Sequence, residues 1–224
     1  MPNPNLTEIV MIVDRSGSMV TIQKDAEGGL NNLFQEQSRV PGEAHVTLVQ
    51  FDTEYEMLFE NKPLRDVPHY ELQPRGATAL LDAMAQTIRS VGDRLERTPD
   101  LQRPGKVVVV VVTDGEENSS KMFTREQVFS MVEHQRTKYA WEFMYLAANQ
   151  DAIAVGMSYG IVNSMNFAAA NGEVKTSYSV ASSNLSQYRK SGVMDQLPVD
   201  VSAVPEARLF VGAPPTTTGG STPS

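Results

Sequence analysis

The sequence has no cysteine among its 224 residues, and it has few aromatic and few basic side chains. The absence of cysteine excludes disulfides and thiolate metal ligands. Its 19 lysines and arginines stand against 27 aspartates and glutamates, which gives a formal net charge of −8. That balance argues against nucleic acid or an anionic membrane as a partner, since both require a basic face. No apolar segment reaches the length of a membrane span.

The first residues also lack the basic start and apolar stretch of a secretory signal, so a cytoplasmic protein is expected. The length and the 41% hydrophobic fraction are typical of one soluble globular domain. Beyond Gly192 the composition shifts towards proline, threonine and glycine. The shift predicts a domain over residues 1–192 and a flexible tail over residues 193–224.

Apolar runs and helical stripes alternate along the predicted domain. Residues 8–13 and the six valines of 107–112 are apolar on both faces, as in the central strands of a parallel sheet. Further strands are expected at residues 45–51, 55–59, 141–147 and 164–168, and helices at 26–34, 80–95, 124–132, 151–156 and 174–188. The second of these strands carries exposed glutamates that suit an antiparallel edge. The pattern predicts an α/β fold, with a doubly wound, mainly parallel sheet, one antiparallel edge strand and helices on both faces.

A carboxylate and two hydroxyls follow the first buried strand directly, at Asp14, Ser16 and Ser18. Alternate residues of an extended chain face the same way, so these oxygens can converge on one point. Such hard donors suit a divalent cation, although the string also fits an ordinary strand-to-helix turn with capping oxygens. Asp114 follows the valine run in the same manner. Ligands of doubly wound sheets bind beyond the carboxyl ends of the strands, so Asp14 and Asp114 are expected to face each other, with Thr78 entering from a third loop.

These motifs together resemble the von Willebrand factor A (vWA) domain. The resemblance rests on Asp14-x-Ser16-x-Ser18, on Thr78 within Gly-Ala-Thr, and on Asp114 within Thr-Asp-Gly. It covers roughly residues 6 to 190. The resemblance implies a Rossmann-like vWA fold with a complete metal-ion-dependent adhesion site (MIDAS), similar to the stand-alone intracellular bacterial and phage members of the family.

The resemblance also implies a role for each site residue. Ser16 and Ser18 would coordinate the cation through their hydroxyls, and Thr78 would bind it directly or through water. Asp14 and Asp114 would act through bound waters or from behind the direct ligands. Mg²⁺ is the expected ion, with Mn²⁺ or Ca²⁺ as alternatives. Neutral hydroxyls leave the ion electrophilic, so a carboxylate of a protein partner would complete its coordination, and a binding module is expected instead of an enzyme.

Several charged residues next to these motifs have two interpretations each. Glu116 and Glu117 either add negative potential or occupy the open coordination position, or they are solvated loop acids, which is the favoured interpretation. Arg15 and Arg75 offset charge or meet an acidic partner, or else are surface arginines without such a role. Asp52, at the end of another strand, is expected as a contact at the rim of the site.

Two other functions remain open at this stage. The first is a metal-dependent phosphohydrolase with Asp14 as nucleophile. Enzymes resembling the haloacid dehalogenases carry a second aspartate two residues after the first, where this chain has Ser16, and the sequence has no Walker A loop. The second is a structural component of an assembly, in which the site is vestigial or only stabilises the fold.

Overall fold

The computed structural model describes residues 1–148, 151–168 and 172–203, and these residues contain a six-stranded sheet in the order β3-β2-β1-β4-β5-β6. The strands are β1 (Asn3–Asp14), β2 (Glu43–Phe51), β3 (Tyr55–Pro63), β4 (Pro104–Thr113), β5 (Glu142–Ala148) and β6 (Ser164–Phe167). Neighbouring strands are parallel except for β2 and β3, which pair antiparallel at one edge. The predicted doubly wound sheet with one antiparallel edge strand is confirmed.

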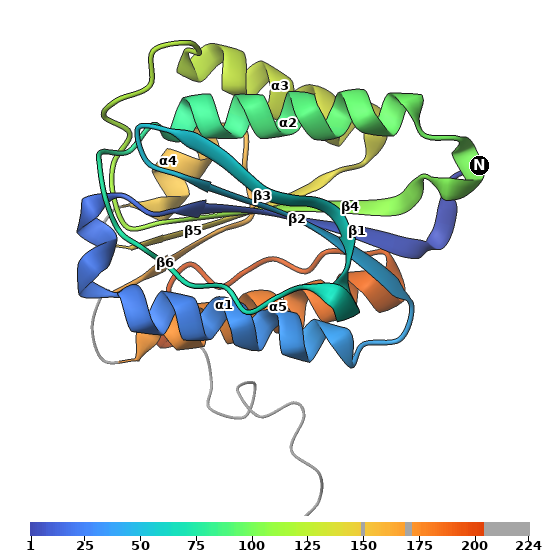
Figure 1. Cartoon of the computed structure of the whole chain (residues 1–224), viewed down its shortest axis with the longest axis horizontal. Helices are drawn as coiled ribbons and strands as arrows, with labels where there is room; N and C mark the ends of the chain where they lie inside the picture. The colour runs from blue at the N-terminus through green and yellow to red at the C-terminus, as the bar shows by residue number, and fades with distance from the viewer. Residues whose placement is uncertain (149–150, 169–171, 204–224) are drawn as a thin grey trace, which may run out of the picture.

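Helices cover both faces of the sheet. The α-helices are α1 (Gln23–Ser38), α2 (Leu80–Arg97), α3 (Arg125–Tyr139), α4 (Ala152–Ser158) and α5 (Glu173–Ser191). The 3₁₀ helices are η1 (Gly17–Thr21), η2 (Leu64–Asp66), η3 (Asp100–Gln102) and η4 (Val201–Ala203). Figure 1 shows α2 and α3 above the sheet and α1 and α5 below it. Within the described ranges, no helix combines the length and the apolar character needed to cross a membrane.

The valine run of β4 divides its side chains between two cores. Val108, Val110 and Val112 pack with residues of α1 and α5, whereas Val107, Val109 and Val111 pack with residues of α2 and α3. Successive side chains of a strand point to opposite faces of the sheet, so a strand covered on both sides is apolar at every position. The helical layers thus explain why this strand shows no polar alternation.

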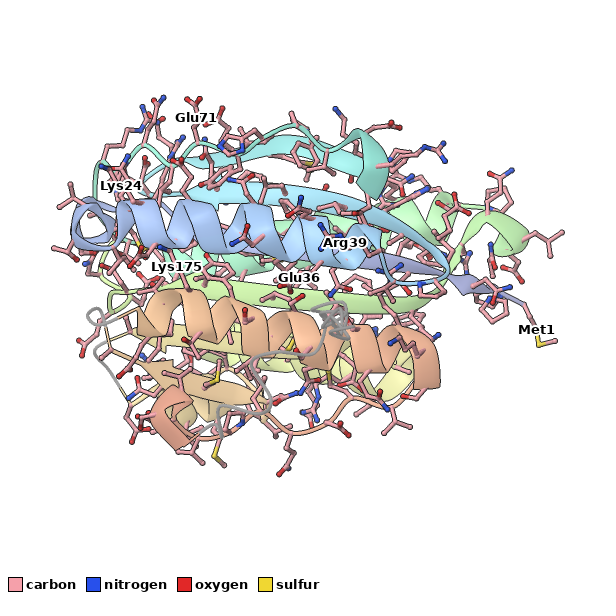
Figure 2. The ribbon with its side chains drawn as sticks, turned by 90° about the horizontal axis from the view of Figure 1, so that it is seen from below. Met1, Lys24, Glu36, Arg39, Glu71 and Lys175 are labelled. Atoms are coloured by element: carbon pink, nitrogen blue, oxygen red, sulfur yellow. The ribbon has the colours of Figure 1, made fainter. Side chains whose placement is uncertain are left out.

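The two helices below the sheet, α1 and α5, lie side by side (Figure 2). A Cβ added at Gly29 of α1 would lie 2.4 Å from the ring of Tyr178 of α5, so the glycine allows this close approach. At the helix surface, Lys175 Nζ lies 3.0 Å from Asp25 Oδ1. Gly29 weakens α1 locally but lets the two helices share one core.

Packing against the sheet continues beyond the predicted domain boundary at residue 192. Leu197 and Val201 are buried, and the Leu197 N–H donates to Asn163 Oδ1 at 2.6 Å. Asp200 forms a parallel bridge with Asn166 of β6. The flexibility predicted for the tail stays a prediction, because residues 204–224 lie outside the described part of the chain.

Candidate metal centre

The candidate site lies where the strand order reverses, between β1 and β4. These strands are parallel neighbours, with Val13 opposite Val112. β1 begins near the N-terminus at the right of Figure 1 and leads to the opposite end of the sheet. Asp14 and Asp114 therefore leave the same end of adjacent strands, as the sequence predicts for a doubly wound sheet.

Asp14 is the most enclosed member of the site, with no exposed surface. Its Oδ1 accepts a hydrogen bond from the Ser16 N–H at 2.6 Å, and its Oδ2 accepts one from Thr113 Oγ1 at 2.6 Å. Burial raises the pKa of Asp14 to about 6, although these hydrogen bonds oppose the shift; the charge of Asp114 raises it further. Asp14 is thus enclosed, with both of its oxygens engaged by the chain.

Hydroxyls and a carboxylate from three loops converge in front of Asp14. Ser16 Oγ lies 3.1 Å from Ser18 Oγ, and Ser18 Oγ donates to Asp114 Oδ1 at 2.7 Å. A Cβ built on Gly115 would lie 3.4 Å from Ser18 Oγ and 3.4 Å from Thr78 Oγ1. The structure thus brings together all five residues that the sequence predicts, around a space that glycine leaves free.

The oxygen spacing fits a small divalent cation. An octahedral ion with bonds of about 2.0–2.1 Å has neighbouring ligands about 2.9 Å apart, from simple geometry. The hydroxyl oxygens of Ser16 and Ser18, which lie 3.1 Å apart, are close to that spacing. In the described part of the chain, no three His, Cys, Asp or Glu side chains cluster as a metal site. The five candidate residues instead supply three hydroxyls and two carboxylates.

The second carboxylate, Asp114, is also disfavoured in its charged form. Burial raises its pKa, and the hydrogen bond from Ser18 opposes the shift. A nearby cation favours the ionised form of a carboxylate, so proton release on cation binding is expected at mildly acidic pH.

The loop that carries Thr78 is fixed by the loop that follows Asp114. Thr78 is buried, and its N–H donates to Asn118 Oδ1 at 3.0 Å. Its carbonyl oxygen accepts hydrogen bonds from the N–H groups of Asn118 at 3.1 Å and Ser119 at 3.2 Å. Thr78 lies in a loop, as expected, and α2 begins two residues later, at Leu80.

For Glu117 the favoured interpretation, a solvated loop acid, is wrong, because both of its carboxylate oxygens accept hydrogen bonds from the chain. Its Oε1 accepts from the N–H groups of Ser119 at 2.9 Å and Ser120 at 2.7 Å. Its Oε2 accepts from the Leu81 N–H at 2.9 Å and from Ser120 Oγ at 2.7 Å. Glu117 thereby caps α2, whose own N-cap residue has no side-chain oxygen bonded to the helix. Glu116, in contrast, is exposed, as the favoured interpretation expects.

Asp52 and Arg15 are both buried. The prediction of Asp52 as a rim contact is therefore wrong, as is the interpretation of Arg15 as a surface arginine, whereas its ion pairs agree with the interpretation that it offsets charge. Asp52 Oδ2 accepts from Arg15 Nε at 2.9 Å and from Arg75 Nε at 2.7 Å, and Arg15 Nη1 reaches Glu56 Oε2 at 2.6 Å. Burial raises the pKa of Asp52, but the Glu54 N–H and the two arginines outweigh it and hold the pKa below its usual value. These ion pairs join the loop after β1 to the β2–β3 turn. Arg75 keeps a half-exposed side chain.

Sequence reasoning assigns no role to three residues that support the site: Thr113, Gly115 and Asn118. The first two lie in the Thr-Asp-Gly motif itself, so their position at a strand end is a usable signal. Asn118 has no local signal, because its partner Thr78 lies 40 residues earlier in the chain.

No protein-family model matches the chain, and no curated protein sequence matches it. Solved structures do resemble it. The von Willebrand factor type A protein from Catenulispora acidiphila has a TM-score of 0.57 at 12% identity, over 80% of this chain and 42% of that one. The vWF domain of the type V pili tip protein Mfa5 from Porphyromonas gingivalis has a TM-score of 0.57 at 10% identity, over 86% of this chain and 97% of that one.

A third similar structure is proximal thread matrix protein 1 from the mussel byssus, with a zinc-occupied MIDAS motif. Its TM-score is 0.52 at 15% identity, over 82% of this chain and 44% of that one. This chain spans less than half the length of the Catenulispora and mussel chains. At these identities the similarity establishes the fold alone: the chain has the vWA fold.

Proposed function

We propose that this vWA-fold chain is a metal-dependent protein-binding module, with Mg²⁺ or Mn²⁺ held at the carboxyl ends of β1 and β4. The observation that carries the proposal is the hydrogen-bonded series Ser16–Ser18–Asp114, which faces Thr78 across Gly115. A zinc-occupied MIDAS in the mussel protein, which has the same fold, supports a metal at this end of the sheet.

The exposure of the site residues suggests how a partner would approach. Asp14, Ser16, Thr78 and Asp114 are buried, whereas Ser18 is exposed. The three hydroxyls would hold the ion, and the two carboxylates would balance its charge from behind. A bound cation supplies a positive centre that can accept a carboxylate oxygen. Because the chain is otherwise acidic, with a net charge of −8, that centre would be the local attraction for an aspartate or glutamate of a protein partner.

The surroundings of Asp14 favour binding over phosphoester hydrolysis. A nucleophilic carboxylate needs an oxygen that the substrate can reach. Both oxygens of Asp14 accept short hydrogen bonds, and the residue has no exposed surface. We therefore assign no catalytic step to the site. Separately, the net charge of −8 supports a protein partner over nucleic acid or an anionic membrane, and we propose a cytoplasmic location.

Calorimetric titration with Mg²⁺ and with Mn²⁺ tests the metal half of the proposal. Wild-type protein should bind with a millimolar or tighter Kd. Ser18→Ala should weaken binding at least tenfold with only a modest fall in Tm, because Ser18 is exposed and loses one hydrogen bond, to Asp114. Ser130→Ala provides the matched control, since Ser130 is an exposed serine on α3 whose hydroxyl donates to the helix backbone at Glu126. Equal binding by wild type and Ser18→Ala would contradict the proposal.

A pull-down with immobilised protein tests the partner half. In the presence of Mg²⁺, the immobilised wild type should capture a protein from native lysate, and EDTA should release it. Immobilised Ser18→Ala should not capture that protein. If capture is the same with Mg²⁺ and with EDTA, the protein-binding half is wrong even where the cation titration succeeds.

A further inference from the structure

One side chain links the loops that carry Thr78 and Asp114 without belonging to the set of predicted ligands. Asn118 accepts a hydrogen bond from the Thr78 N–H through Oδ1, at 3.0 Å. Its own N–H donates to the Thr78 carbonyl at 3.1 Å. A single residue therefore holds both backbone polar groups of Thr78.

The Thr78 carbonyl has a second donor, the Ser119 N–H at 3.2 Å, and the Ala79 N–H donates to the Asp52 carbonyl at 3.0 Å. It is therefore the Thr78 N–H that depends on Asn118. Thr78 precedes α2, which begins at Leu80, and the N-cap residue Ala79 has no polar side chain to organise the entry into the helix. The buried Thr78 N–H requires a partner, because an unpaired buried N–H is costly. In the described structure that partner is the Asn118 side chain.

The loop that presents Asn118 is itself firmly held. Asp82 of α2 accepts hydrogen bonds from the N–H groups of Lys121, Met122 and Phe123, at 2.8, 3.0 and 2.9 Å. Glu117 bonds to the first turn of the same helix at the other end of the loop. Asn118 is exposed, so no core packing depends on its side chain.

We infer that Asn118 is a positioning residue of the cation site, which acts through the hydroxyl of Thr78; this inference rests on the proposed function. Any residue except proline at position 118 can donate its N–H to the Thr78 carbonyl. Only a side chain with an acceptor oxygen at the reach of Asn118 Oδ1 can hold the Thr78 N–H. Without it, the peptide before Thr78 is free to turn, and Thr78 Oγ1 loses its place across Gly115 from Ser18 Oγ.

Titration with Mn²⁺ alone tests the inference. Asn118→Ala should bind Mn²⁺ about tenfold more weakly than wild type, a typical effect of removing a group that orients a metal ligand. Asn118→Asp keeps the acceptor oxygen and should bind like wild type at about 1 M salt, where charges are screened beyond roughly 3 Å. Asn32→Ala, an exposed asparagine on α1, is the matched control.

A double-mutant cycle separates positioning from a general effect on the fold. Thr78→Val keeps the shape of the side chain but removes its hydroxyl. In the Thr78→Val background, Asn118→Ala should cause no further loss of Mn²⁺ affinity. An equal loss in both backgrounds would show that Asn118 acts through the fold, and the inference would be wrong.

The outcomes also separate this inference from the proposed function. If wild type does not bind Mn²⁺, the proposed function fails. If wild type binds and Asn118→Ala binds equally well, the inference alone fails. Should Asn118→Ala not fold, Asn118→Gln takes its place, because it keeps the amide but displaces the acceptor oxygen by one methylene. Unchanged affinity in that variant would likewise overturn the inference.

Discussion

Asp14 should make the metal-free protein less stable as the pH rises, and Asp14→Asn should remove that effect. The pKa of Asp14 is raised from 3.8 to about 6 by burial. Between these values the folded state holds a proton that the unfolded state releases, so stability is full below pH 3.8 and is lost as the pH rises through 6. A shift of about two units at 1.36 kcal/mol each corresponds to about 3 kcal/mol of unfolding free energy.

Denaturant unfolding of metal-free protein measures this loss between about pH 3.5, just below the ordinary pKa of 3.8, and about pH 8, well above the raised pKa of Asp14. The unfolding free energy of wild type should fall by about 3 kcal/mol more than that of Asp14→Asn, because asparagine carries no charge at any pH. Asp114 is present in both proteins, so its own titration largely cancels in the comparison. Asp66→Asn, an exposed position on η2, controls for the type of substitution. Parallel curves for wild type and Asp14→Asn would refute the reasoning.

Three other substitutions test separate parts of the structure. Gly115→Ala places a methyl 3.4 Å from two hydroxyls of the site; Tm should stay within a few degrees while Mn²⁺ titration shows weaker binding. Thr113→Val removes a hydrogen bond to the buried Asp14, so it should cost about 1–3 kcal/mol at neutral pH in denaturant unfolding and raise the pKa of Asp14 further in the pH series. Gly29→Ala drives a Cβ to 2.4 Å from the Tyr178 ring and should cost about 1–3 kcal/mol by overpacking, with unchanged cation affinity.

The fold and the convergence of the five candidate residues at one end of the sheet could be predicted because their signals are local. The valine run of β4 is apolar at every position, which indicates a strand covered on both faces. Asp14 and Asp114 follow two such strands directly, and parallel strands bring their carboxyl ends to one edge of the sheet. Thr78 stands two residues before a strongly amphipathic helix, so its loop also ends at that edge.

The supporting contacts could not be predicted, because they depend on partners that are distant in sequence. Arg15 and Asp52 read as surface charges, yet each is buried against the other. Glu117 reads as a solvated acid, but the first turn of α2 lies within its reach once the sheet has formed. No periodicity or spacing marks such pairs, since a charged residue has the same local pattern whether solvent or an opposite charge meets it.

Crystals grown with Mn²⁺ provide the most direct test of the cation site. An anomalous difference map should show one peak within about 2–2.3 Å of Ser16 Oγ and Ser18 Oγ, beside Thr78 Oγ1 and in front of Asp14. A peak at any other position, or none at this one under saturating Mn²⁺, would contradict the assignment of these residues as a metal centre.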